Sequence, residues 1–410
     1  MRILFFSHYY PPEGNAPAAR THGHCRRWAA AGHEVTVVTC APNHPRGVVY
    51  PGYRNRLRRV ERMDGVRVVR VFTYLAANEG VFRRAASWLS YVAAAALAGL
   101  AERRPDVVIA TTPQFFCAWA GLAVGRLRRR PVLIEIRDLW PESVADLGAL
   151  RSRSALGLLD RLARWTWAAA DRIVTVGEGY RRGLTGRGVD PARVRVVMNG
   201  VDRELFRPRA ADPAAAARLG VAGRFVVAWC GTIGLAAGLD VVLRAAAALA
   251  ARGRRDVVFL LVGDGARLDA LRAAAAERGL DNVVFTGRLD RARIPEVLSC
   301  SDACLVHLRA LKTFTTVMPS KIFEAAAMGR PVILGVRGFA RRLVEDAGCG
   351  LCIEPEDADG LVSAVLRLAG DPALRQRLGE AGRTWAATFD RERLAARYLE
   401  IIESVARGAG

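Results

Sequence analysis

A lysine and a glutamate three residues apart could together hold a charged ligand. Lys321 and Glu324 stand at the start of a predicted helix that has Ser320 as its N-cap residue, runs to about Met328 and stops at Gly329. A lysine in the first turn opposes the helix dipole. An anion bound there would reverse that effect, because free N–H groups and the ammonium group would both point at it. The segment therefore predicts an anion site.

Glu324 lies on the same face of this predicted helix as Lys321. A carboxylate one turn behind a phosphate site is well placed to accept hydrogen bonds from both hydroxyls of a ribose. The same two residues are also compatible with an ordinary surface ion pair.

Glycine-bearing turns follow several predicted strands, where backbone could pass close to a ligand. The candidate positions in these turns are Gly14, Asn15, Gly231, Thr232, Gly234, Gly263, Gly265, Arg288 and Leu289. The turn at Gly14 lacks the G-x-G-x-x-G spacing, which disfavours a dehydrogenase-type dinucleotide fold. The turn at Arg288 could present backbone groups to a nucleobase edge. Each turn is also compatible with a plain loop.

Charged residues cluster after one strand of the first half of the chain. Arg137, Asp138 and Glu142 flank Trp140 there. In parallel α/β sheets, ligands bind beyond the carboxyl ends of strands, so these residues are expected at a binding cleft. The alternative is a structural Arg–Asp pair covered by the tryptophan.

Short apolar runs alternate with helical stretches along the chain, which predicts βαβ units and an α/β fold with parallel sheets covered on both faces. The predicted strands are 3–6, 35–38, 66–71, 107–110, 132–136, 173–176, 194–197, 225–230, 257–262, 283–286, 303–308, 331–334 and 350–353. A polar, proline-containing stretch at 203–213 suggests a linker. We therefore expect doubly wound domains at 1–205 and 206–390, with a last helix in 391–410 that packs back on the first domain.

Composition narrows the classes of function. The formal charge is +21, from 61 basic and 40 acidic residues, but Lys312 and Lys321 are the only lysines. The arginines are spread along the chain and no nucleic-acid module is recognisable, so nucleic acid is not expected as a partner. Eight cysteines predict neither a disulfide framework nor, given their apolar surroundings, a zinc site. The start of the chain does not look like a signal peptide, and a cytoplasmic location is expected.

The motifs together resemble glycosyltransferase family 4, which are retaining enzymes of the GT-B fold. The resemblance is to the branch of bacterial L-fucosamine and colanic-acid-type polysaccharide glycosyltransferases. It rests on Tyr10-Pro-Pro-Glu-Gly, Arg137-Asp-Leu-Trp-Pro-Glu-Ser, Asn199-Gly-Val-Asp, Gly231-Thr-Ile-Gly and Pro319-Ser-Lys-Ile-Phe-Glu. It implies two Rossmann-like domains facing across a cleft, with the acceptor on the N-terminal domain and the nucleotide-sugar on the C-terminal domain.

The resemblance also implies roles for particular residues. Lys321, with backbone near Gly14 and Gly231, would hold the diphosphate, and Glu324 the ribose. Asp138 falls where family members present polar groups to the transferred sugar or acceptor. The chain departs from the family at Thr316, where the first acid of the E-x7-E motif would stand, and at Ala237 and Thr232, where basic residues are usual.

The expected function is transfer of a sugar, with an N-acetylated amino sugar as one candidate, from a nucleotide diphosphate donor. We expect a UDP-sugar as donor, a polyprenyl-diphosphate-linked sugar or a glycan as acceptor, and no cofactor or obligatory metal. The departures leave an inactive GT-B scaffolding module as the alternative. A basic patch of Arg54, Arg56, Arg58, Arg59, Arg83 and Arg84 precedes the apolar run 85–101 and, with Trp88 and Tyr91, predicts peripheral contact with an anionic membrane. A solvated basic face is equally compatible with that patch.

Overall fold

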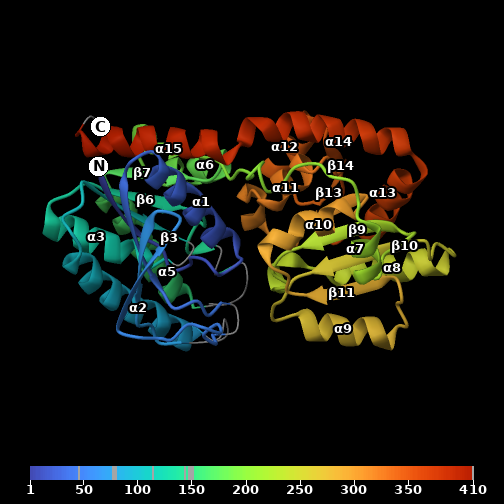
Figure 1. Ribbon diagram of the computed structural model, residues 1–410, viewed down its shortest axis with the longest axis horizontal. Coiled ribbons are helices and arrows are strands. Elements are labelled where there is room, and N and C mark those ends of the chain that lie inside the picture. The colour runs from blue at the N-terminus through green and yellow to red at the C-terminus, as the bar shows by residue number, and fades with distance from the viewer. Residues whose placement is uncertain (45–46, 76–80, 113–114, 143–144, 146–151, 409–410) are drawn as a thin grey trace. The chain divides into compact units, whose positions relative to one another are not determined.

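The computed structural model describes residues 1–44, 47–75, 81–112, 115–142, 145 and 152–408, and these form two compact units (Figure 1). The first unit contains residues 1–198 and 391–410, and the second contains 199–390. The division falls at 198/199 instead of 205/206, and the last helix belongs to the first unit.

The first unit has an eight-stranded sheet in the order β3-β4-β2-β1-β5-β6-β7-β8. Its strands and α-helices are β1 (Arg2–Phe6), α1 (Ala16–Ala30), β2 (Glu34–Cys40), β3 (Arg58–Met63), β4 (Val66–Val71), α2 (Val81–Ala101), β5 (Val107–Thr111), α3 (Cys117–Arg128), β6 (Val132–Ile136), α5 (Arg153–Ala169), β7 (Arg172–Thr175), α6 (Glu178–Thr185), β8 (Val194–Val196) and α15 (Arg391–Ala406). All neighbouring strands are parallel except β3, which pairs antiparallel with β4.

Helices cover both faces of this sheet, with α2, α3 and α5 on one face and α1 and α15 on the other (Figure 1). The Trp28 Nε1 of α1 donates to the Ala395 carbonyl of α15 at 2.9 Å, and the ring of Tyr398 meets Trp28 edge-on. These contacts attach α15 to the first unit. No helix in the described part of the chain, α2 with its 21 residues included, is long and apolar enough to cross a membrane.

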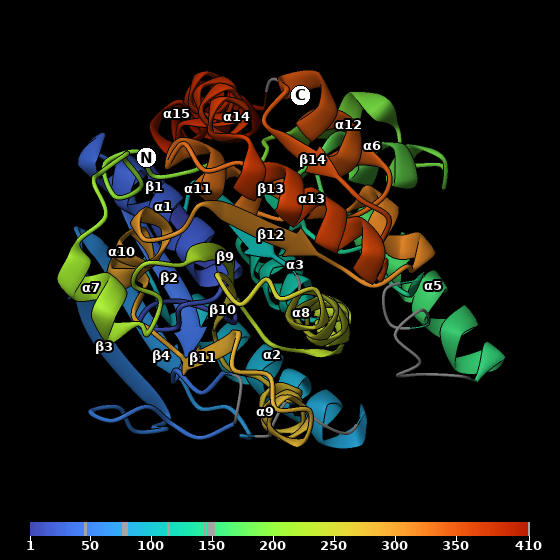
Figure 2. The ribbon, with the colours of Figure 1, turned by 90° about the vertical axis from the view of Figure 1, so that its right-hand side faces the viewer.

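The second unit has a six-stranded, fully parallel sheet in the order β11-β10-β9-β12-β13-β14. Its strands and α-helices are α7 (Pro213–Arg218), β9 (Phe225–Cys230), α8 (Asp240–Ala251), β10 (Val257–Val262), α9 (Leu268–Glu277), β11 (Val283–Gly287), α10 (Ile294–Ser299), β12 (Ala303–His307), α11 (Lys321–Ala327), β13 (Val332–Gly335), α12 (Phe339–Ala347), β14 (Gly350–Cys352), α13 (Ala358–Gly370) and α14 (Pro372–Ala386). Helices α8, α9 and α13 cover one face, while α11, α12 and α14 pack together on the other (Figure 2).

The strand orders place a switch in chain direction at the first strand of each sheet. In the second unit β9 lies between β10 and β12, and in the first unit β1 lies between β2 and β5. The loops after such neighbouring strands diverge, which opens the sheet edge to a ligand. The architecture confirms the expected pair of doubly wound, Rossmann-like domains.

Candidate active site

Lys321 lies over the switch point of the second unit. Its ammonium nitrogen stands 3.6 Å from the centre of the Trp229 ring, on β9. A Cβ atom built on Gly231, directly after β9, would come within 2.8 Å of the same nitrogen. No carboxylate within the described residues forms an ion pair with Lys321. Burial lowers the pKa of Lys321 to about 8, against the opposing effects of Cys230 and Glu324. The group is therefore a cation without a neutralising partner.

The start of α11 differs from the sequence prediction. Ser320 occupies the N-cap position, but its side chain makes no capping hydrogen bond. The N–H groups of Ile322 and Phe323 donate to the carbonyls of Pro319 and Ser320 at 3.2 and 3.1 Å. The first turn is thus closed on itself, and α11 has only seven residues. An anion here would be held by the ammonium group and not, as predicted, by these N–H groups.

Glu324 forms an ion pair, but not with Lys321. Its Oε1 accepts from Nη2 of Arg291 at 2.8 Å, and the Arg291 guanidinium stacks over the Phe206 ring. Oε2 of Glu324 makes no hydrogen bond to any residue that the structure describes. One carboxylate oxygen is held in place and the other is available to a ligand. The sequence analysis missed Arg291, because nothing in its local sequence distinguishes it from the neighbouring arginines.

The glycines after β9 and β10 pack against each other. The N–H of Gly231 donates to the Val262 carbonyl at 2.9 Å, and Ile233 donates to Asp264 at 3.0 Å. A Cβ on Gly263 would overlap the Gly231 carbonyl, and one on Gly265 would come within 2.6 Å of the Ile233 carbonyl. Gly263 and Gly265 thus have a positioning role, because they allow the loop that carries Gly231, Thr232 and Gly234 to approach. Their contact with a ligand stays a prediction. Thr232 itself is exposed.

The turn predicted to meet a nucleobase has less free backbone than expected. The Gly287 carbonyl accepts from the Gly263 N–H at 2.9 Å and from the Thr286 hydroxyl at 2.8 Å. Arg288 is exposed and Leu289 is half-buried. Thr316, at the family's acid position, ends a short 3-10 helix (Lys312–Thr316), and its hydroxyl donates to the Thr313 carbonyl.

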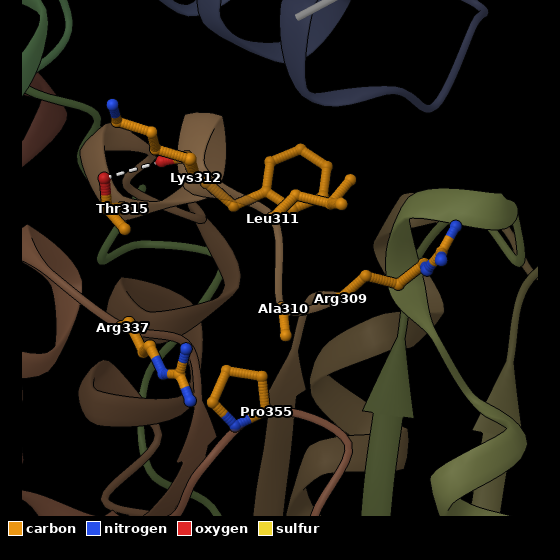
Figure 3. Close-up of a pocket in the computed structure, with 8 residues that line it drawn as sticks. Arg309, Ala310, Leu311, Lys312, Thr315, Arg337 and Pro355 are labelled. Carbon is orange, nitrogen blue, oxygen red and sulfur yellow. Dashed lines mark hydrogen bonds between the residues drawn. The ribbon is translucent and has the colours of Figure 1, made fainter. Parts of the chain in front are cut away.

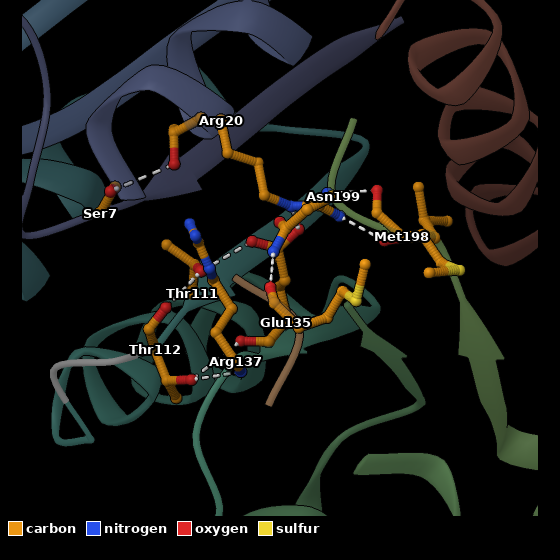
Figure 4. A network of polar contacts seen from close by, with 11 residues as sticks. Ser7, Arg20, Thr111, Thr112, Glu135, Arg137, Met198 and Asn199 are labelled. Atoms are coloured by element: carbon orange, nitrogen blue, oxygen red, sulfur yellow. Dashed lines mark hydrogen bonds and ion pairs between the residues drawn. The ribbon is translucent and has the colours of Figure 1, made fainter. Parts of the chain in front are cut away.

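A polar network in the first unit surrounds Glu135, at the end of β6 (Figure 4). Arg20 Nε donates to Glu135 Oε2 at 3.0 Å, and the Thr111 hydroxyl donates to Oε1 at 2.9 Å. The other two nitrogens of Arg20 donate to the carbonyls of Val197 and Met198, both at 2.8 Å. Every hydrogen-bonding group of this buried pair has a partner. The sequence analysis did not identify this pair, because Glu135 stands within an apolar strand and Arg20 lies far from it in the chain.

Arg137 and Asp138 follow directly on β6 but form no ion pair with each other. The backbone N–H of Arg137 donates to the Thr112 hydroxyl at 2.8 Å. Burial lowers the pKa of Arg137 to about 10 and raises the pKa of Asp138 to about 6, although each charge partly offsets the other's shift. The alternative of a structural Arg–Asp pair is therefore wrong.

Glu142 does not join Arg137 and Asp138. It is exposed and forms an ion pair with Arg187 at 2.8 Å, and Arg187 also pairs with Asp160 of α5. The Arg187 guanidinium stacks over Trp167. This pairing connects Glu142 to α5 through Arg187 and Asp160. Substrate binding by Glu142 stays a prediction.

Gly14 and Asn15 lie at the start of α1. The Asn15 side chain caps the helix by accepting from the Ala18 N–H at 2.9 Å, and Gly14 is exposed. Glu13, the acid of the Tyr10-Pro-Pro-Glu-Gly motif, is buried and accepts from the N–H groups of Asn43 and His44, both at 2.9 Å. Burial raises the pKa of Glu13 to about 7. The motif therefore braces two loops at this edge of the sheet.

A hollow of about 330 Å³ lies in the second unit beyond β12, β13 and β14 (Figure 3). Arg309, Lys312, Thr315 and Arg337 are among its lining residues. Arg337 pairs with Glu354 at 2.6 Å, and the Lys312 side chain extends away from the other lining side chains. The sequence analysis did not identify this hollow, because its walls come from three loops far apart in the chain.

Cysteine and histidine side chains do not gather into a ligand set. All eight cysteines are free, and six of them are buried. Within the described ranges no three His, Cys, Asp or Glu side chains come close enough to hold a metal ion.

Comparison with known protein families matches each unit to a glycosyltransferase domain. Residues 15–200 match the glycosyl transferase 4-like domain, and residues 216–385 match the glycosyl transferases of group 1. The chain belongs to this glycosyltransferase family. Its two matched domains coincide with the two units, and Lys321 and Glu324 fall within the group 1 domain.

Two relatives illustrate the range of this glycosyltransferase family. WcaI of Escherichia coli (strain K12), a glycosyl transferase named for colanic acid biosynthesis, is 26% identical over 89% of this chain and 91% of its own. The D-inositol 3-phosphate glycosyltransferase of Nocardioides sp. is 33% identical over 57% of this chain and 53% of its own.

Solved structures confirm the GT-B fold of this glycosyltransferase. Anabaena HepE in complex with UDP-glucose superposes with a TM-score of 0.71 at 19% identity, over 98% of this chain and all of that one. WaaG, a glycosyltransferase of lipopolysaccharide biosynthesis, superposes with a TM-score of 0.72 at 18% identity, over 98% and 99% of the two chains.

Proposed function

We propose that this glycosyltransferase transfers a sugar from a UDP-sugar to a lipid-linked or glycan acceptor of cell-surface polysaccharide synthesis, with retention of anomeric configuration. An N-acetylated amino sugar is a candidate for the transferred group. The observation that carries the proposal is Lys321, a cation without a neutralising partner at the Gly231 loop, beside a carboxylate with one free oxygen. The UDP-glucose complex of HepE, which shares the fold, supports the choice of donor.

The chemistry follows from where charge develops. As the bond between sugar and diphosphate breaks, negative charge grows on the leaving diphosphate, and a preorganised ammonium group stabilises it more than it stabilises the ground state. Lys321 supplies that group. Glu324 Oε2 accepts hydrogen bonds from the ribose hydroxyls, while Arg291 holds Oε1 and fixes the carboxylate. The proposal also includes Asp138, which lies near the transferred sugar or the acceptor, and a reaction that needs no metal ion.

Thermal shift against UDP-, GDP- and dTDP-sugars tests the donor. A ligand at 100 times its Kd adds about 2.7 kcal/mol of stability, and we expect that gain from a UDP-sugar. The same sugar should then transfer to a polyprenyl-diphosphate-linked acceptor, and NMR of the product should show the donor's anomeric configuration. Absence of any shift and any transfer across the panel would refute the assignment.

Two substitutions favour a second candidate, an inactive GT-B module that binds nucleotide and scaffolds an assembly. Thr316 replaces the first family acid, and its hydroxyl is turned to its own 3-10 helix. Ala237 replaces the usual lysine and is buried. Nucleotide binding without transfer from any donor would favour this candidate.

Some of the residues predicted to contact a membrane are not available to it, although Arg54 and Arg56 are exposed. Tyr91 is fully buried, Arg58 pairs with Glu102, and Trp88 packs against Phe116 and Trp140. The side chain of Arg84 lies outside the described residues.

The outer surface of α2, α3 and α5 offers the alternative. Large apolar side chains are exposed on all three helices: Leu89 and Leu97 on α2, Leu127 on α3, and Leu158 and Trp165 on α5. Exposed arginines on and beside α3 and α5 include Arg126, Arg129, Arg153 and Arg161. Apolar and cationic side chains together suit the surface of an anionic bilayer. We assign the peripheral contact to this surface.

Sedimentation with vesicles checks the assignment. Each arginine near an anionic surface contributes about 1 kcal/mol, so the protein should bind phosphatidylglycerol vesicles and not phosphatidylcholine vesicles. The triple variant Leu127→Gln, Leu158→Gln, Trp165→Gln should bind at least tenfold more weakly. Leu235→Gln, at a similarly exposed leucine of the second unit, is the control. Equal binding of the triple variant and the control would exclude this surface.

A further inference from the structure

One buried cation of the first unit lacks a partner. Arg137 is only 8% exposed, and its Nη1 makes no hydrogen bond. It forms no ion pair with any residue that the structure describes. A buried charge that is neither paired nor hydrogen-bonded is strongly destabilising, so its presence requires a compensating group.

The neighbouring acid does not supply that group. Both oxygens of Glu135 accept hydrogen bonds, from Arg20 and from Thr111, and Arg20 neutralises its charge. Figure 4 shows Arg20 and Arg137 reaching this region from α1 and from the end of β6. Arg20 and Glu135 therefore neutralise each other, and Arg137 lies outside this ion pair.

The nearby histidine does not compensate the charge of Arg137 either. Burial lowers the pKa of His24 well below its usual value, and the charges of Arg20, Arg391, Arg27 and Arg137 lower it further. His24 is thus neutral and does not compensate the positive charge of Arg137. Among the described residues, Asp138 is the remaining acid beside Arg137, and the two side chains make no ion pair.

We propose that the Arg137 guanidinium binds a phosphate oxyanion of a substrate at the carboxyl end of β6. The ligand class is a phosphate or diphosphate group, because a guanidinium presents paired N–H donors that match two phosphate oxygens. The inference deepens the proposed function and rests on it: the donor and the lipid-linked acceptor each carry a diphosphate. The Thr112 hydroxyl, bonded to the Arg137 N–H, positions the residue.

Isothermal titration of the full chain with two probes tests the inference. UDP reports the donor's diphosphate, and inorganic pyrophosphate added over saturating UDP reports a second anion. In Arg137→Met one of the two affinities should fall roughly 10- to 100-fold, the usual effect of losing a charge-assisted hydrogen bond. Loss of UDP affinity would mean that Arg137 binds a phosphate of the donor. Loss of pyrophosphate affinity would mean that it binds a phosphate of the acceptor. Arg137→Lys should retain part of the affinity.

A stability measurement separates binding from a structural role. Removing an unpaired buried cation should leave the melting temperature of Arg137→Met unchanged or raise it. Arg172→Met is the matched control: Arg172 is equally buried, but its Nη1 donates to the Ala192 carbonyl, so this variant should melt lower and bind normally. If both affinities of Arg137→Met stay intact, the proposal is overturned, and a lower melting temperature would then show a structural role. If Lys321→Ala loses UDP binding in the same experiment, the proposed function survives that result.

Discussion

Lys321→Ala should abolish most donor binding and transfer without unfolding the protein. The ammonium group has no protein carboxylate to satisfy, so its removal leaves no uncompensated partner behind. It does remove the charge that meets the leaving diphosphate. Losing one preorganised donor of this kind costs about 10²–10³ in kcat. Titration with UDP and steady-state transfer assays measure the two effects separately.

The pH dependence of donor binding provides a second measure of Lys321. Because burial lowers its pKa to about 8, the free protein carries the cation below that pH and loses it above. UDP affinity should therefore fall as the pH rises from 7 to 9. In Lys321→Arg the charge persists, and this fall should disappear.

Lys312→Ala is the matched control, since Lys312 is the only other lysine and is exposed in the same unit. It should bind UDP with the wild-type affinity and keep the wild-type pH profile. A wild-type affinity for Lys321→Ala would place the diphosphate elsewhere and remove the donor site proposed for this protein.

The sequence predicted the fold well because the strands of parallel sheets are buried on both faces and form continuous apolar runs. For this reason, thirteen of the fourteen strands in the described part of the chain begin within one residue of their predicted positions. The strand that was missed, β3, has four charged residues among its six and lies antiparallel at the sheet edge, half exposed. Its pattern resembles a solvated loop as much as a strand.

The candidate site was predictable only in part. Lys321 and Glu324 stand out by residue type and by their spacing from a helix start. Their real partners, Trp229 and Arg291, come from other segments of the chain, and no local pattern connects them. Tyr91 was predicted at a membrane-contacting surface because it lies in an apolar run beside arginines. Its hydroxyl is instead buried and donates to the Val38 carbonyl. Packing between distant segments decides such cases.

Gly263→Ala should destabilise the second unit and disrupt the donor loop together. The backbone at Gly263 has a φ of +150°, which side-chain-bearing residues rarely adopt, and the new Cβ would overlap the Gly231 carbonyl. Backbone strain costs about 1–3 kcal/mol, and overpacking costs a further 1–3 kcal/mol. The loop after β9 must move to relieve the overlap, which separates Gly231 from Lys321.

Gly253→Ala distinguishes this overlap from backbone strain alone. Gly253 also has a positive φ, of +72°, but a Cβ there would meet nothing within 4 Å. We expect Gly253→Ala to cost about 1 kcal/mol and to bind UDP normally, whereas Gly263→Ala should lose both stability and UDP affinity. Denaturant unfolding and UDP titration of the two variants make the comparison. Similar behaviour of the two would mean that the contact between the β9 and β10 loops does not position Lys321, and that the ammonium group is held by α11 and Trp229 alone.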